Sequence, residues 1–337
     1  MNLKNKSLLI TGGTGTFGSS FVRYCLNNTN LKKIIIFSRD EMKQYLMLNS
    51  LNKKQKSKVR FFIGDIRDKD RLNMAMNEVD IVVHAAALKQ VDTAEYNPFE
   101  AVKTNVLGTQ NIIESALNNN VSKVIGLSTD KASSPINLYG ATKLTSDKLF
   151  ISANNYKGKR KIAFSVVRYG NVFGSRGSVL NLFLNQSKNK NFTVTDKKMT
   201  RFNITIKDAI EFILESIRIM QGSEIFIPKL KSYRIVDLVK ALSANPKIKI
   251  IGLRPGEKLH EEMISINDPS YVFEFSKFYI LLPNSYNLSR YNTTRFNDYK
   301  ILKKSISYNS FNNKSFLTIN NLKSLILDYK NNTNDIL

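Results

Sequence analysis

Short apolar runs alternate with longer helical patterns over the first half of the chain. These runs consist mostly of aliphatic, β-branched or aromatic residues and lie at residues 8–11, 34–37, 61–63, 81–84, 124–128 and 163–167. Consecutive apolar positions are typical of parallel strands covered on both faces, because neither face meets water. The alternation therefore predicts a doubly wound α/β sheet in which helices connect parallel strands.

The clearest predicted helix begins at Asn97-Pro98, a capping residue followed by proline at the first helical position, and ends near residue 117. After Gly170 the regular alternation fades. Helical segments at 208–220 and 236–243 are then separated by short strands, and a final capped helix is predicted at 321–327 within a less regular tail that starts at 287. We divide the chain into a first domain, 1–170, and a smaller α/β domain, 171–337, some of whose segments return to the first.

Composition narrows the class of protein. With 42% hydrophobic residues among 337, the chain can build a full core. No apolar run reaches the ~20 residues of a membrane span, and the N-terminus lacks a signal-peptide pattern, so a soluble cytoplasmic protein is expected. The lone Cys25 is expected to be buried. His84 and His260 lie far apart in the sequence, so we expect no metal site.

The formal net charge of +24 raises the question of a polyanionic partner. The basic residues are spread along the chain, and no basic stripe interleaved with aromatic residues accompanies them. We therefore expect an acidic small molecule rather than nucleic acid as the partner, and a homo-oligomer of undefined size.

Three glycines follow the first predicted strand. Gly12 permits a tight turn, Gly15 lets the backbone approach a pyrophosphate, and Gly18 lets helix and strand pack closely. The amide groups and dipole of the next helix then meet the phosphate charge. This predicts a dinucleotide site whose loop also contains Thr14, Thr16 and Phe17.

The end of the second strand bears on which dinucleotide is bound. Ser38, Arg39 and Lys43 suit a 2′-phosphate and favour NADP, whereas Asp40 could instead hold the ribose hydroxyl of NAD. Asp65, beside Ile66, either accepts from the adenine amino group or caps the next turn. Further cofactor contacts are expected from the end of the fourth strand and the helix after it, at Ala85, Ala86, Ala87, Lys89 and Asn105. Asn105 lies in the middle of its helix and is also expected to tie the helix to the active-site strand. Lys89 could instead be solvated.

Tyr139 and Lys143 form a Y-x-x-x-K motif at the start of the helix that follows the fifth strand. The spacing places both side chains on one helical face. A nearby lysine and a nicotinamide cation lower the pKa of a tyrosine, which can then take a proton from an alcohol as hydride leaves for the cofactor. Thr129 supplies the hydroxyl residue upstream.

On these residues the chain resembles the extended short-chain dehydrogenase/reductases. Within them it is similar to the inverting, 5-epimerising UDP-N-acetylglucosamine 4,6-dehydratases that begin pseudaminic acid synthesis. The match covers residues 7 to about 265, and its most specific segments are 127–132, 137–143 and 254–258. The resemblance implies a redox-neutral lyase in which C4 is oxidised, water is lost from C5 and C6, hydride returns to C6 and C5 is inverted.

The resemblance also assigns roles. Asp130 and Lys131 match the acid/base pair, Lys131 toward C5 and Asp130 mainly toward C6; otherwise they form a loop ion pair. Retaining dehydratases carry Asp-Glu at this pair, and simple 4-epimerases need no such pair. The UDP-sugar is expected to meet Lys89, Asn171, Ser178, Val179, Arg201, Arg254 and Glu257. Arg201, Arg254 and Glu257 could instead form surface ion pairs.

Two positions depart from the relatives: Asn203 replaces an aromatic residue, and Asn181 replaces a proline. Both put the exact sugar in doubt. The competing interpretations are a 4-epimerase or retaining dehydratase of the same fold, a dinucleotide-binding regulator without turnover, and a nucleic-acid binder.

Overall fold

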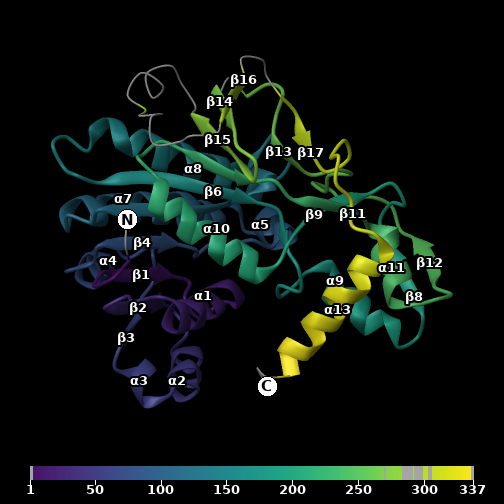
Figure 1. Cartoon of the computed structure of the whole chain (residues 1–337), viewed down its shortest axis with the longest axis horizontal. Coiled ribbons are helices and arrows are strands. Elements are labelled where there is room, and N and C mark those ends of the chain that lie inside the picture. The colour runs from purple at the N-terminus through teal and green to yellow at the C-terminus, as the bar shows by residue number, and fades with distance from the viewer. Residues whose placement is uncertain (1–2, 269–270, 283–290, 292–298, 303–305, 335–337) are drawn as a thin grey trace.

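The computed structural model describes residues 3–268, 271–282, 291, 299–302 and 306–334. Its largest layer is a sheet of ten strands with the order β16-β14-β15-β10-β6-β5-β4-β1-β2-β3 (Figure 1). The six strands predicted from the sequence are all present and parallel: β1 (Ser7–Thr11), β2 (Lys33–Ser38), β3 (Val59–Ile63), β4 (Ile81–His84), β5 (Lys123–Thr129) and β6 (Ala163–Tyr169). The strand order reverses between β1 and β4, and ligands of such sheets bind at this point.

Helices connect and cover these parallel strands on both faces, as expected for a doubly wound sheet. They are α1 (Thr16–Asn28), α2 (Glu41–Asn49), α3 (Lys53–Lys56), α4 (Lys69–Ala75), α5 (Val91–Tyr96), α6 (Pro98–Val102), α7 (Gly108–Asn118) and α8 (Leu138–Tyr156). The helix predicted from Asn97 to residue 117 is α6 and α7 joined by a π-helical turn, η1 (Lys103–Leu107). Such turns are frequent at functional sites.

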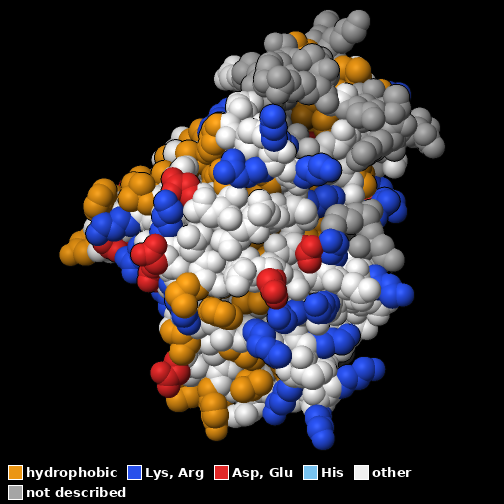
Figure 2. All heavy atoms as spheres, turned by 90° about the vertical axis from the view of Figure 1, so that its left-hand side faces the viewer, with side chains coloured by type: hydrophobic (Ala, Val, Ile, Leu, Met, Phe, Trp, Pro, Cys, Tyr) orange, Lys and Arg blue, Asp and Glu red, His pale blue; other side chains and the backbone are white. Residues whose placement is uncertain are grey.

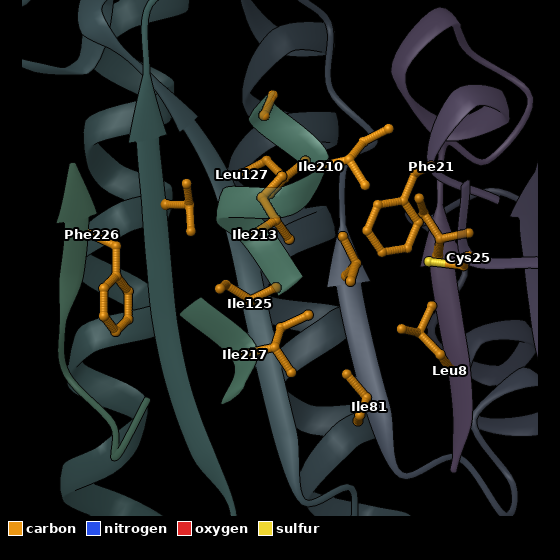
Figure 3. Packing of buried hydrophobic residues seen from close by; sticks show 14 of the residues in the cluster. Leu8, Phe21, Cys25, Ile81, Ile125, Leu127, Ile210, Ile213, Ile217 and Phe226 are labelled. Carbon is orange, nitrogen blue, oxygen red and sulfur yellow. The ribbon is translucent and has the colours of Figure 1, made fainter. Parts of the chain in front are cut away.

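Segments from beyond residue 170 return to this sheet. β10 (Ile225–Pro228) pairs parallel to β6, and three strands extend the edge: β14 (Tyr271–Glu274), β15 (Phe278–Leu282) and β16 (Lys300–Leu302). Helix α10 (Ile206–Ile219) lies across one face of the sheet (Figure 3). Its Ile210, Ile213 and Ile217 enter the same core as Phe21 and Cys25 of α1. Cys25 is buried, as predicted.

A smaller lobe stands beside the C-terminal ends of the parallel strands (Figure 1). It has its own apolar core, which includes Phe183, Phe192, Leu238 and Leu322. Its elements are β7 (Asn171–Val172), α9 (Val179–Ser187), β8 (Asn191–Val194), β9 (Thr200–Ile204), β11 (Lys231–Arg234), α11 (Ile235–Leu242), β12 (Lys247–Ile250) and α13 (Ile319–Asn334). The short strands β13 (Glu262–Ile264) and β17 (Tyr308–Asn309) pair with each other, and their Met263, Ile264 and Tyr308 join a core cluster of the main sheet. The predicted final helix is thus α13, while part of the irregular tail lies outside the described residues.

On the face shown in Figure 2, Lys and Arg side chains lie in small groups between uncharged side chains.

Within the described ranges, no helix is long and apolar enough to cross a membrane. The described residues also contain no group of three or more His, Cys, Asp or Glu side chains that could hold a metal ion. His84 is a core residue: its Nδ1 lies 2.8 Å from Thr11 Oγ1, and burial lowers its pKa to about 3.

Candidate active site

A cavity of about 750 Å³ runs along the C-terminal ends of the parallel strands and into the smaller lobe. Its size suits a pocket for a small-molecule ligand. Every residue predicted from the sequence to serve the cofactor, the chemistry or the substrate lines this cavity, except Asn105. The fold thus brings together residues from the glycine loop at position 12 to Glu257.

The glycine loop has the geometry predicted for it. Gly12 has φ +66°, a left-handed conformation that side chains disfavour. A Cβ on Gly18 would lie 2.4 Å from the Gly12 carbonyl oxygen, so only glycine permits this contact between helix and loop. Thr11 joins the loop to the next strand end, because its hydroxyl accepts hydrogen bonds from the amides of Ala85 and Ala86 at 3.1 and 3.2 Å. The result is a cradle whose helix presents unpaired first-turn amides to a phosphate.

At the end of β2, polar side chains surround the place where a nucleotide ribose is expected. The amide of Gln44 donates to the Ser38 hydroxyl at 3.0 Å, which leaves the Ser38 proton free to donate. Asp40 caps α2 by accepting from the Lys43 amide at 3.0 Å, and it also pairs with the Lys43 ammonium group. Arg39 is 58% exposed and lies 3.7 Å from Asp65. The Asp40 carboxylate is therefore already used to cap α2. Arg39 lines the cavity, and its ion-pair partner Asp65 lies at the longer distance of 3.7 Å.

Two predicted cofactor contacts serve the protein itself. Asp65 accepts from the backbone amide of Arg67 at 3.0 Å and from its guanidinium group at 2.7 Å, which supports the turn-capping interpretation. Asn105 lies in the π-turn, is buried, and does not line the cavity. Its side chain instead bonds the amide and carbonyl of Leu88, each at 2.9 Å, and Thr142 at 3.0 Å. It fixes the strand end that carries Lys89, whose ammonium group donates to the Arg176 carbonyl at 3.0 Å.

Tyr139 and Lys143 share one face of α8 and both line the cavity. The helix starts correctly because Asn137 caps it, accepting from the Gly140 amide at 2.8 Å. Burial lowers the pKa of Lys143, while Asp147, one turn further along, raises it. Asp147 forms a buried ion pair with Arg168 at 3.1 Å. The carboxylate that acts on Lys143 is therefore held in place by an arginine.

The protein groups alone do not lower the pKa of Tyr139 below its ordinary value. Burial raises the pKa of Tyr139 to about 12, and this outweighs the lowering by the charge of Lys131 and a hydrogen bond from Thr129. The protein thus keeps this phenol protonated. A cationic group beside it in the cavity is needed to lower its pKa.

Asp130 and Lys131 lie in η2 (Asp130–Ala132), directly after β5. The Lys131 ammonium group is 3.1 Å from Asp130 Oδ1 and 2.9 Å from Oε1 of Glu261. The Thr129 hydroxyl donates to the same Asp130 oxygen at 3.0 Å. Lys131 therefore sits between two buried carboxylates, in a larger cluster than the two-residue pair read from the sequence.

This cluster sets the protonation of its members. Burial and the Glu261 charge raise the pKa of Asp130 above its ordinary value, although Lys131 and the Thr129 hydroxyl oppose the rise. Burial lowers the pKa of Lys131, but Asp130 and Glu261 together raise it above its ordinary value. The two carboxylates therefore stabilise Lys131 as an ammonium group.

The predicted guanidinium groups form a chain with one carboxylate. Arg201 is buried and lies 3.5 Å from Glu257, which in turn is 3.6 Å from Arg254. Arg254 is 57% exposed, so its side chain is free to turn toward an anion. Asn171 Oδ1 and Ser178 Oγ are buried and have no hydrogen-bond partner within the described part of the chain. Both line the cavity, where a ligand could satisfy them.

The two positions expected to depart from relatives, Asn203 and Asn181, lie in the smaller lobe. Asn203 in β9 pairs in register with Asn171 of β7. Asn181 donates to the Ser175 carbonyl at 3.1 Å and accepts from Tyr329 of α13 at 2.9 Å. Asn181 thereby links the loop beside Ser178 to the C-terminal helix.

Glu261 is the functional residue that the sequence analysis missed. It lines the cavity, is 2% exposed and contacts Lys131. It lies within the segment that matches the relatives, but His260-Glu261-Glu262 offers two adjacent acids, and no local pattern indicates which one points inward. Only the lysine's need for a buried partner could have suggested it.

A doubly wound sheet, a glycine cradle, a Y-x-x-x-K helix and a second lobe closing the cavity define an extended short-chain dehydrogenase/reductase. A sequence profile of the family described as "Polysaccharide biosynthesis protein" matches residues 8–283, which is more than half of the chain. The chain belongs to this family.

Individual relatives narrow the comparison. A protein of Campylobacter jejuni subsp. jejuni named "UDP-N-acetylglucosamine 4,6-dehydratase (inverting)" is 52% identical over 281 residues, 83% of each chain, which confirms the resemblance inferred from the sequence. A Rickettsia bellii protein named "UDP-glucose 4-epimerase" is 43% identical over 283 residues, 82% of each chain. The X-ray structure of Pen from Bacillus thuringiensis has a TM-score of 0.88 at 40% identity, covering 98% of this chain and 99% of that one.

Proposed function

We propose that this protein is an inverting UDP-N-acetylglucosamine 4,6-dehydratase that uses a nicotinamide dinucleotide, with NADP preferred. The observation that carries the proposal is the meeting of Tyr139 and Lys143 with the Asp130–Lys131 cluster in one cavity. A dehydrogenase needs only the first pair, whereas elimination of water needs an additional acid and base. The similarity to the Campylobacter dehydratase supports the same reaction.

The cradle at Gly12 and Gly18 fits a dinucleotide pyrophosphate. Ser38, Arg39 and Lys43 would surround a 2′-phosphate. A bound nicotinamide supplies the acceptor for the hydride of C4 and the donor for C6. Its positive charge would also oppose the burial that raises the pKa of Tyr139.

In the first step Tyr139 accepts the proton of the C4 hydroxyl group, and C4 becomes a ketone. The ketone makes the C5 hydrogen acidic. Lys131 then acts at C5 and Asp130 at C6, where an acid must protonate the departing hydroxyl group. The raised pKa of Asp130 suits that second role. Transfer of the Lys131 proton to Asp130, 3.1 Å away, would leave the lysine neutral to accept the C5 proton and Asp130 protonated to donate to the departing hydroxyl group.

The substrate's diphosphate and uridine are assigned to the smaller lobe. Arg201 and Arg254 suit the diphosphate, because guanidinium groups bind phosphate oxygens in pairs. Glu257 would then exchange its arginine partners for the uridine ribose. Asn171 and Ser178 would gain the hydrogen-bond partners they lack within the described residues.

The decisive experiment is incubation with UDP-N-acetylglucosamine and NADP in deuterated water, followed by NMR of the product. We expect a 4-keto-6-deoxy sugar with deuterium at C5 and the L-arabino configuration. Retention at C5 would make the protein a retaining dehydratase. A C4 epimer that keeps its C6 hydroxyl group would make it an epimerase like the one named for the Rickettsia relative. Absence of any turnover would favour a binding protein.

A further inference from the structure

The assignment of Lys131 leaves unexplained what holds this lysine in place. A lysine at the end of a flexible stem contributes to a proton transfer only if its nitrogen is fixed near the reacting carbon. Asp130 is its neighbour in sequence, but a single adjacent carboxylate leaves the stem free to swing. The second contact is Oε1 of Glu261, 2.9 Å from Lys131 Nζ.

Glu261 is itself held from several sides. Its backbone amide donates to Ser310 Oγ at 2.9 Å, and its carbonyl accepts from the Ser310 amide at 2.8 Å. Ser310 is completely buried and also lies 2.7 Å from Thr200 Oγ1. On the side-chain end, Arg201 Nε lies 3.6 Å from Glu261 Oε1. The Glu261 carboxylate is therefore held in a fixed position and is not a mobile surface group.

The charged and titratable groups that face Glu261 come from η2, β9, β11 and the segment of Glu261 itself. Asp130 and Lys131 approach from η2, Arg201 from β9, Tyr233 from β11, and Lys258 from its own segment. Burial raises the pKa of Glu261, but Lys131 and Arg201 outweigh this and lower it, so the group stays ionised. Its other oxygen, Oε2, is buried without a hydrogen bond in the described part of the chain.

We propose that Glu261 is a positioning residue for Lys131: its buried carboxylate, paired with Arg201 and carried on a backbone that Ser310 holds, fixes the lysine as an ammonium group at the Asp130 end of the cavity. This inference rests on the proposed function for its catalytic consequence, but not for the ion pair itself. Glu261 thereby controls when Lys131 can act as a base. An ammonium group cannot accept a further proton, and Asp130 and Glu261 both stabilise this charged form of the lysine.

The direct test measures the charge state of Lys131 without any substrate. Trace labelling with acetic anhydride at several pH values, quantified by peptide mass spectrometry, reports how readily each lysine exists as a free amine. In Glu261→Gln, loss of one of the two carboxylates is expected to lower the Lys131 pKa by about one unit and speed its labelling at pH 9 roughly tenfold. Exposed Lys148 serves as the internal reference.

The second test follows the reaction. In Glu261→Gln we expect C4 oxidation, seen as absorbance at 340 nm, to stay within about threefold of wild type, because Tyr139 and Lys143 do not contact Glu261. Exchange of C5 hydrogen and release of product are expected to fall on the order of 10–100-fold, with KM unchanged and the limb of the pH profile that belongs to Lys131 shifted to lower pH. Glu261→Asp keeps the charge and is expected to recover part of the loss.

Glu262→Gln is the matched control, because this neighbouring carboxylate bonds Ser134 and Ser307 rather than Lys131. Unchanged Lys131 labelling in folded Glu261→Gln, or equal losses of C4 oxidation and elimination, would overturn the proposal. If Glu261→Gln does not fold, the same labelling comparison is made on Glu261→Asp, where the weaker contact is expected to give a smaller increase. If wild-type protein does not dehydrate the UDP-sugar, the proposed function fails, while the labelling result still decides the role of Glu261.

Discussion

The two ends of the cavity are built in different ways. At the cofactor end, the glycine loop, the end of β2 and the Ala85–Ala87 segment all come from the first ninety or so residues, and each follows its own strand. At the other end, Asp130 and Lys131 follow β5, but their partners come from distant segments. Arg201 lies in β9 and Glu261 just before β13, and Ser310 follows β17.

This difference separates binding from chemistry. The cofactor end uses backbone amides and small residues, whose function depends on local conformation. The chemical end uses buried charges, and a buried charge is tolerated only when it is paired. Because the pairing partners must arrive from elsewhere, this end can be complete only after the smaller lobe has folded against the sheet.

The largest effect is expected for Tyr139→Phe, at the boundary between the two ends. Turnover is expected to fall on the order of 1,000-fold because the ring still packs but no group accepts the C4 proton. Cofactor binding, measured by fluorescence titration, is expected to stay unchanged. Tyr156→Phe, at the far end of the same helix, is the control. Near wild-type turnover of Tyr139→Phe would show that another group is the base.

Lys131→Ala is expected to stop the reaction one step later. Elimination is expected to fall on the order of 100-fold, because the C5 proton loses its acceptor while Tyr139 remains. Stopped-flow absorbance at 340 nm is then expected to show C4 oxidation without release of the dehydrated product. Lys148→Ala controls for loss of a positive charge. Product release at the wild-type rate would show that elimination does not need Lys131. The chemistry would then not be divided between the two ends of the cavity.

Arg39→Ala tests the cofactor end alone. Loss of a charge-assisted hydrogen bond to a 2′-phosphate is expected to weaken NADP by roughly 2 kcal/mol, about 30-fold in Kd. NAD binding is expected to change little, since it has no such phosphate. Equal weakening of both dinucleotides, measured by calorimetry, would remove the assignment of Arg39 to the phosphate.

Ser310→Ala is the mildest change. It tests the chemical end of the cavity through Ser310, the member of the cluster that lies furthest along the sequence from Asp130 and Lys131. Removal of the buried hydroxyl, which contacts Thr200 and the Glu261 amide, is expected to lower the free energy of unfolding by about 1–2 kcal/mol. Elimination is expected to slow severalfold, while NADP affinity stays the same. Denaturant unfolding and binding titrations measure the two effects. A loss of NADP affinity would show that Ser310 supports both ends.

Much of the fold could be predicted from the sequence because parallel strands and their helices carry local signals. All six predicted strands are present, and Asn97-Pro98 does begin a helix. The π-turn within that helix was not predicted; it contains Asn105, whose side chain reaches Leu88 across space. Asn105 ties this helix to the segment after β4, as predicted, but it does not line the cavity.

The sequence by itself determined the doubly wound sheet and the glycine cradle, and it predicted Tyr139, Lys143, Asp130 and Lys131 as the chemical residues. Each of these depends on neighbours within one strand–turn–helix unit. Only the tertiary structure decided the protonation of those residues, because burial raises the pKa of Tyr139 and a carboxylate 2.9 Å away holds Lys131 charged. Burial and long-range pairing are properties of the packed molecule, and no spacing along the chain encodes them.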